Sequence, residues 1–211
     1  MPEPEEGQFG IMHPDAQDVR DAPSRALKAK PMIFRWFAPT SREASIASLY
    51  GAIVAQARSP AFYQTYRVPD TVMGRLEMII LHAVLVLRRL QGDAPAGREL
   101  GQALFDRFCQ DMDDNMREMG VGDLAVPRKM RRIGEVFYGR QSAYGAALAT
   151  AQNGELAAVL ARNVFAHSLE ADGPARLAAY SRAALDGLAA QDCFERGEIS
   201  FPDPERVVHH G

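Results

Sequence analysis

LFDRFCQDMDDNMREMGVGDLAVPRKMRRIGEVFYGR, residues 104–140, is the stretch that decides the fold. Apolar residues at helical spacing before Gly120 and after Pro127 predict two helices joined by a short turn. Charge is sorted along this stretch. Residues 106–123 carry six acids against two arginines, a net charge of −4, and residues 127–140 carry five bases against one acid, a net charge of +4. A solvated helix pair does not need this separation, so the pattern predicts a surface that meets a partner.

We call residues 111–132 the elbow and predict that they form this surface. The basic cluster (Arg128, Lys129, Arg131 and Arg132) collects at a helix start, where the helix dipole is already positive and further bases cost some stability. A contact with phosphate or with an acidic protein is the functional interpretation, and an ordinary solvated turn is the structural one. Methionines suit irregular apolar partners, although those of the elbow could equally be core residues. The predicted partner-binding residues are Asp111, Asp113, Asp114, Met116, Arg117, Glu118, Met119, Arg128, Lys129, Met130, Arg131 and Arg132.

Helical periodicity continues through most of the chain, and no useful β alternation occurs. The most apolar run, residues 78–87, is apolar on every face and predicts the central helix of a bundle. It has ten residues, whereas a spanning helix needs about 20. Met73 and Met119 are assigned to buried stripes. The predicted helices run from 40 or 41 to about 59, 60–66, 71 to about 91, 95–119, 127 to about 151, 155 to about 167 and from 172 to at least 188. The prediction is an all-α fold, a single-domain multi-helix bundle.

The two ends of the chain differ from this body. Residues 1–30 are rich in Pro, Glu, Gly, Asp and Ala and predict a disordered tail. Residues 31–195 are predicted as the helical domain and 196–211 as an irregular tail, because Pro202 and Pro204 forbid a continuous helix. Within the domain, PMIFRWFAP at 31–39 predicts a short segment docked over the core. Its alternative is an interfacial anchor, which would make the protein a peripheral membrane adaptor.

Composition narrows the location and the partners. A net charge of −3 is too mild for general nucleic-acid affinity, so no DNA partner is expected. The acidic N-terminus has neither a secretory signal nor a mitochondrial transit signature. Cys109 and Cys193 lack metal-ligand spacing and are predicted to be reduced thiols. The predicted location is cytoplasmic, with peripheral contact at the inner membrane as an option.

Sequence motifs for catalysis are missing: there is no GxGxxG, GxxxxGK[ST], HExxH or GxSxG. His82 lies in the most apolar run and is predicted to be a hydrogen-bonded core histidine. Asp111, Asp114 and Glu118 share a helical face and could bind a divalent ion if a second helix supplied ligands. No Glu-x-x-His motif offers them, so metal binding is kept only as an alternative. The prediction is a non-enzymatic protein without cofactor or metal.

Three segments carry a family resemblance. FYQTYRVPDTVMGRLEMIILHAVLVLRRL at 62–90, the stretch from Gln102 to Arg140, and LARNVFA at 160–166 resemble the ubiquinol–cytochrome c chaperone family. The similarity spans about residues 40–190, and DMDDNMREMGVGD at 111–123 is its most specific part. The resemblance implies an all-helical assembly factor for the cytochrome b subunit of respiratory complex III. Such a factor holds newly made cytochrome b until haem and other subunits arrive.

The resemblance also implies partners. The client would be cytochrome b, either nascent or newly inserted. Mitochondrial members of the family work with a small partner protein near the ribosomal tunnel exit, so a ribosome or a small protein is a further expected partner. Because the N-terminus lacks a transit signature, the chain looks like a bacterial member.

Overall fold

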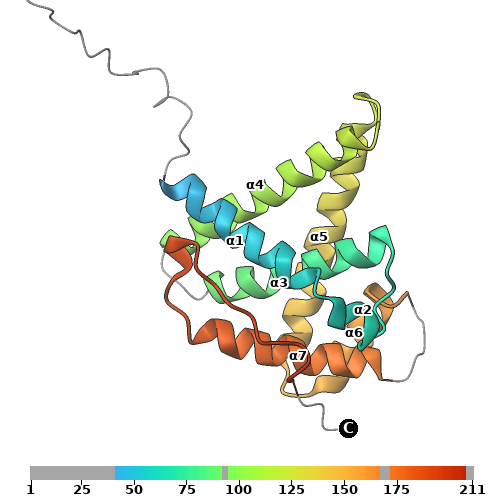
Figure 1. The fold of residues 1–211 in the computed structure, drawn as a ribbon, viewed down its shortest axis with the longest axis vertical. Helices are drawn as coiled ribbons and strands as arrows, with labels where there is room; N and C mark the ends of the chain where they lie inside the picture. The colour runs from blue at the N-terminus through green and yellow to red at the C-terminus, as the bar shows by residue number, and fades with distance from the viewer. Residues whose placement is uncertain (1–40, 92–94, 167–171, 208–211) are drawn as a thin grey trace, which may run out of the picture. The chain divides into compact units, whose positions relative to one another are not determined.

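The computed structural model describes residues 41–91, 95–166 and 172–207. All of them belong to one compact unit, residues 39–211, and the predictions for 1–30 and 31–39 lie outside the described residues. The described part is helical and contains no strand, which confirms the all-α prediction (Figure 1). Its helices are α1 (Ser41–Ala57), α2 (Pro60–Gln64), α3 (Val72–Gln91), α4 (Pro95–Glu118), α5 (Val126–Ala149), α6 (Asn153–Asn163), α7 (Gly173–Ala189) and the short 3₁₀ helix η2 (Phe194–Arg196).

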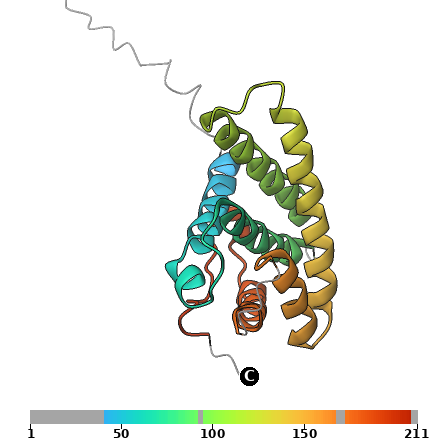
Figure 2. The same ribbon diagram turned by 90° about the vertical axis from the view of Figure 1, so that its right-hand side faces the viewer.

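Helix α3 is the central helix, as its sequence predicts. Residues 77–87 are buried without interruption, and Leu81 and Leu85 are completely enclosed. The helix packs against α1, α4, α5 and α7, which lie around it in two perpendicular views (Figures 1 and 2). Within the described residues, no helix combines the length and the apolar character that crossing a bilayer requires.

His82 is the polar centre of this core and is fully buried. Its Nδ1 lies 2.8 Å from the carbonyl oxygen of Met78, and its Nε2 lies 2.9 Å from the hydroxyl of Tyr180. A carbonyl can only accept, so the proton sits on Nδ1 and Nε2 accepts from the tyrosine. The Nε2 of Gln56 donates in turn to the Tyr180 oxygen at 2.9 Å. The prediction of a hydrogen-bonded core histidine is therefore confirmed, and its network joins α1, α3 and α7.

The segment after η2 is irregular in shape but packed onto the helices. The hydroxyl of Tyr66 donates to the carbonyl of Pro204 at 2.7 Å, and Gln56 donates to the carbonyl of Pro202 at 3.1 Å. The ring of Phe201 lies edge-on against His82, with 5.2 Å between ring centroids. These contacts show how the segment can be part of the compact unit although its prolines exclude a helix.

A buried ion pair between α3 and α5 is absent from the sequence-based predictions. Glu77 is only 4% exposed and accepts two hydrogen bonds from Arg140, from Nε at 2.9 Å and from Nη2 at 2.7 Å. This paired geometry holds the guanidinium in one orientation and raises the pKa of Arg140. Arg140 was counted with the bases of the charge-sorted stretch 104–140, although not among the predicted partner-binding residues, and its charge is used inside the bundle.

Two details of the predicted helices are wrong. Met73 is 58% exposed, because it lies in the first turn of α3, ahead of the part that the other helices cover. Helix α6 ends at Asn163 rather than near 167. The backbone of Ala166 has a φ of 49°, in the left-handed region, which a continuing α-helix excludes. Phe165 turns into the core at this point.

The Glu77–Arg140 pair gives a stability prediction. Arg140→Met should lower the free energy of unfolding by about 3 kcal/mol, because it leaves the Glu77 carboxylate buried without its partner. The double variant Glu77→Leu, Arg140→Met should recover most of this loss, since neither partner then remains alone. Urea unfolding of the wild type and both variants measures the difference. A double variant as unstable as Arg140→Met alone would contradict the assignment.

His82 gives a pH prediction. Burial lowers the pKa of His82 to about 4, against about 6.5 in the unfolded chain. Between these values the unfolded chain binds the extra proton, so the free energy of unfolding falls as the pH drops. From pH 7 to pH 5 this single group should remove about 2 kcal/mol of stability. Urea unfolding of wild type and His82→Gln at both pH values isolates the effect, because the carboxylates are common to both. Equal pH dependence in the two proteins would contradict it.

Candidate functional site

The turn of the elbow lies at the end of the unit away from α6 and α7 (Figures 1 and 2). Helices α4 and α5 pack on α3 and on each other, but chiefly with the halves remote from this turn. Between residues 109 and 118 only Met116 is buried, and between 127 and 136 no residue is. The elbow is therefore made by two helices that continue past the core they cover.

The turn itself has a defined geometry. Gly120 adopts a φ of +77°, the left-handed conformation that glycine reaches without strain. Its N–H bonds the carbonyl of Arg117 at 2.9 Å, and the N–H of Val121 bonds the carbonyl of Met116 at 3.0 Å. This pair of bonds is the Schellman motif, which satisfies the last carbonyls of α4. Pro127 then lies in the first turn of α5, where a missing N–H is tolerated.

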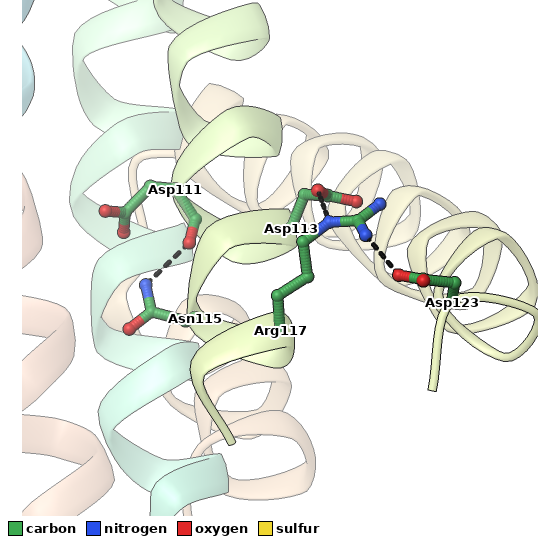
Figure 3. A network of polar contacts seen from close by, with 5 residues as sticks. All are labelled: Asp111, Asp113, Asn115, Arg117 and Asp123. Atoms are coloured by element: carbon green, nitrogen blue, oxygen red, sulfur yellow. Dashed lines mark hydrogen bonds and ion pairs between the residues drawn. The ribbon is translucent and has the colours of Figure 1, made fainter. Parts of the chain in front are cut away.

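Contacts within the unit hold most of the acidic half of the elbow. Asp111 accepts a hydrogen bond from the hydroxyl of Tyr50 on α1 at 2.8 Å. Burial and this contact raise the pKa of Tyr50. The Arg117 guanidinium lies between two carboxylates, donating to Asp113 at 2.6 Å and to Asp123 at 2.5 Å (Figure 3). Of the predicted acidic residues, only Asp114 and Glu118 remain exposed without a side-chain partner among the described residues.

The basic half differs from the acidic half in this respect. All four side chains of the basic cluster are exposed, and none forms a hydrogen bond or ion pair with any other described residue. Arg128, Arg131 and Arg132 lie on the side of α5 opposite Val126 and Phe137, which face the core, and Lys129 lies on its flank. Among the described residues, the basic cluster therefore forms no ion pairs with the acidic half of the elbow.

Four apolar residues of the elbow divide between core and surface. Met116 is buried and Met130 is half-buried. Met119 is 66% exposed, so its assignment to the buried stripe of α4 is wrong. The helix ends at Glu118, and the chain reverses before Met119 can reach the core. Leu124 is 100% exposed and was missed, although an isolated leucine within a glycine-containing turn was a visible signal.

A second feature that the sequence did not reveal is an apolar cavity of about 250 Å³ at the base of the elbow. Helices α3, α4 and α5 all contribute to its walls. The half-buried ring of Phe105 lies 4.9 Å from that of Phe137 and 5.2 Å from that of the exposed Tyr138. The lining residues include Leu87, Gly101, Phe105, Phe137 and Tyr138.

The metal alternative finds no support in the described part of the chain. No group of three His, Cys, Asp or Glu side chains there lies close enough together to hold an ion. Asp111 is directed to Tyr50 and Asp113 to Arg117, so the carboxylates on this part of α4 do not converge on one point. Cys109 and Cys193 are both free thiols.

Comparison with known proteins assigns this chain to a family. The family model described as ubiquinol-cytochrome C chaperone matches residues 64–201, which include the whole elbow. The chain belongs to this family. The family named by the resemblance is thereby confirmed, and it is a family of chaperones rather than of enzymes.

Two relatives of the chaperone show how far the similarity extends. The ubiquinol-cytochrome-c reductase complex assembly factor 1 of Xenopus laevis is 24% identical over 157 residues, which cover 72% of this chain and 77% of the relative. The crystal structure of the Cbp3 homolog from Brucella abortus superimposes with a TM-score of 0.72 at 38% identity, covering 80% of this chain and 94% of that one. The fold of the chaperone is thus shared over most of its length.

The Schellman turn makes the shape of the elbow testable. Gly120→Ala should lower the free energy of unfolding by about 1 kcal/mol, because alanine must adopt a left-handed φ. Gly134→Ala on α5 is the matched control, since it lies inside a helix and a Cβ there meets nothing within 4 Å. It should leave stability unchanged or raise it. Thermal unfolding of both variants provides the comparison, and a destabilising Gly134→Ala with a neutral Gly120→Ala would contradict this description of the turn.

Proposed function

We propose that the chaperone is an assembly factor for the ubiquinol–cytochrome c reductase complex, that its client is newly made cytochrome b, and that the elbow is its client-contact surface. Family membership and the name of the Xenopus relative support a role in assembly of this complex. The family resemblance points to cytochrome b as the client. The observation that carries the choice of surface is the exposed basic cluster without partners beside exposed Met119 and Leu124.

The physical chemistry of the elbow suits a chaperone that must release what it binds. Charged side chains accelerate encounter and fix orientation while adding little to final affinity. Met119 and Leu124 add a small apolar area, and methionine adapts to irregular partners. A small contact area is typical of transient rather than permanent complexes. Held in this way, an apolar client can pass to its assembly partners without a large barrier to dissociation.

The cavity at the base of the elbow extends this surface. An apolar side chain of the client could enter the space beside Phe105 and Tyr138, where aromatic rings offer a large contact area. The exposed ring of Tyr138 lies on α5, the helix that also carries the basic cluster. Charge at one end of α5 and an apolar cavity further along it would together orient a bound polypeptide.

The client determines where the chaperone acts. Cytochrome b is a membrane protein, so we propose that the chaperone works as a peripheral protein at the membrane that receives this subunit. The nascent and the newly inserted forms of the client are both compatible with an exposed elbow. A ribosome or a small partner protein, as the resemblance implies, would need a surface beyond the one that the client occupies.

A deletion strain complemented with variants tests the proposal. Loss of the gene should lower assembled complex III while unrelated membrane complexes keep their level. The double variant Arg128→Glu, Arg132→Glu should recover roughly tenfold less cytochrome b with the purified chaperone. The new glutamates would repel the acidic client groups that the basic cluster is proposed to contact. The matched control Arg58→Glu, Arg162→Glu changes the net charge equally at exposed sites outside the elbow and should behave as the wild type.

The two measurements test the assembly function and the contact surface separately. Normal complex III levels in the deletion strain would refute the assembly function itself. Unchanged recovery of cytochrome b with the Arg128→Glu, Arg132→Glu variant would leave the function standing and remove the basic cluster from the contact surface. Circular dichroism of each purified variant shows whether the helical unit is intact.

A further inference from the structure

The structure distinguishes two halves of the elbow that look equivalent in the sequence. Asp111, Asp113 and Asp123 all accept hydrogen bonds from side chains of the same unit. The basic cluster has no such contact among the described residues and faces away from the core. The positive charge without partners is therefore gathered on the first two turns of α5, apart from the acids of α4, although the elbow as a whole carries five acids and five bases. This asymmetry favours an anionic partner.

The apolar residues of the turn narrow the kind of partner. Leu124 is 100% exposed and Met119 is 66% exposed, at the point where the chain reverses. Residues 128–132 follow within the first two turns of α5, so the basic residues lie about 3 to 9 Å along the helix axis from its first residue, Val126. This separation is comparable with the depth, about 5 to 10 Å, at which apolar side chains of peripheral proteins lie in the headgroup and acyl boundary of a bilayer.

We propose that the elbow docks on an anionic bilayer surface. Leu124 and Met119 enter the interface, and the basic cluster contacts the phosphate groups of acidic lipids. The inference rests on the proposed function only in that the client resides in a membrane; lipid binding itself needs no client. Docking of this kind would bring the chaperone to the place where its client enters the bilayer.

The acids near the turn bear on this orientation. Asp123 is the neighbour of Leu124, and its carboxylate is bound by Arg117. Asp114 and Glu118 lie on α4, the other helix of the elbow. Glu135 follows the basic cluster on α5, one turn further from the tip. Four bases therefore precede the first acid on the docking helix, and the positive potential is concentrated near the turn.

Two other anionic partners fit the elbow less well. Proteins that bind single-stranded nucleic acid stack bases on aromatic side chains, and residues 111–132 contain no aromatic residue. A soluble acidic protein, unlike the apolar client proposed above, would pair with the bases but would give no reason for two exposed apolar side chains at the tip. A bilayer interface accounts for both features together.

The size of the effect follows from the charges. Each basic residue near an anionic membrane strengthens binding roughly fivefold. Arg128→Gln, Arg132→Gln should then weaken binding on the order of twenty- to thirtyfold. The control Arg58→Gln, Arg162→Gln lowers the net charge by the same amount at exposed sites outside the elbow and should change binding by no more than about twofold.

Vesicle flotation with the full chain tests the proposal. Vesicles of phosphatidylcholine containing about 30% phosphatidylglycerol should carry the wild type at about 0.05 M salt, pure phosphatidylcholine vesicles should not, and salt should release the bound protein. Leu124→Ser should weaken binding about fivefold, while Val72→Ser, which removes another exposed apolar side chain, should not. Because every variant keeps residues 1–40, any contribution of that segment is common to all of them.

Several outcomes would overturn the proposal. They are equal binding to neutral and anionic vesicles, equal loss in the elbow and control variants, and unchanged flotation of Arg128→Gln, Arg132→Gln. Binding of a single-stranded RNA oligomer by the basic cluster without vesicle binding would assign the surface to nucleic acid. If Arg128→Gln, Arg132→Gln lost cytochrome b capture in a neutral detergent but kept its vesicle binding, the basic cluster would be assigned to protein contact alone. Failure of flotation leaves the deletion test untouched, so the two proposals can fall independently.

Discussion

The structure depends on the enclosure of residues 77–87, the apolar part of α3. A helix segment that is apolar on every face is unfavourable at a surface exposed to water, so other elements must cover it from all sides. Helices α1, α4, α5 and α7 do so. The two strongly polar residues in its buried stretch, Glu77 and His82, are tolerated because each has partners that satisfy its polar atoms.

These two residues also fix which helices cover α3. His82 selects α7 through Tyr180, and the Gln56 bond to the same hydroxyl brings α1 into the network. Glu77 selects α5 through Arg140 and holds it by two hydrogen bonds. Apolar packing alone would tolerate small rotations of the surrounding helices, whereas these bonds are lost when a helix turns by one residue. The position of the elbow follows, because α5 extends from this anchored point to the turn.

Sequence reasoning predicted the helices well because their ends carry strong local signals. Pro60, Pro95, Pro127 and Gly120 mark ends that differ from the predictions by one or two residues at most. It failed where the outcome depended on distant contacts. Arg140 looks like one more base of the charge-sorted stretch until its partner on α3 is known. Met119 fits a helical stripe, but the helix ends one residue earlier.

The sequence predicted the turn between α4 and α5 but not which of its charged side chains have partners within the unit. The spacing of charges located the elbow, yet no sequence pattern shows that Tyr50, more than sixty residues away, contacts Asp111. The sequence also does not show that Arg117 forms ion pairs with both Asp113 and Asp123. The sequence therefore described two equal and opposite halves, whereas in the folded chain only the basic half is largely without partners. The exposure of Leu124 likewise depends on how far the two helices extend past the core.

The same asymmetry would allow a chain with a net charge of −3 to bind the anionic surface proposed above. Electrostatic attraction over a Debye length of about 8 Å depends on the local potential rather than on the charge of the whole molecule. Arg117 screens part of the charge of Asp113 and Asp123, and the basic cluster lies on α5, whereas Asp111, Asp114 and Glu118 lie on α4. An elbow whose acids and bases alternated along both helices would present no positive surface, and orientation would then depend on shape alone.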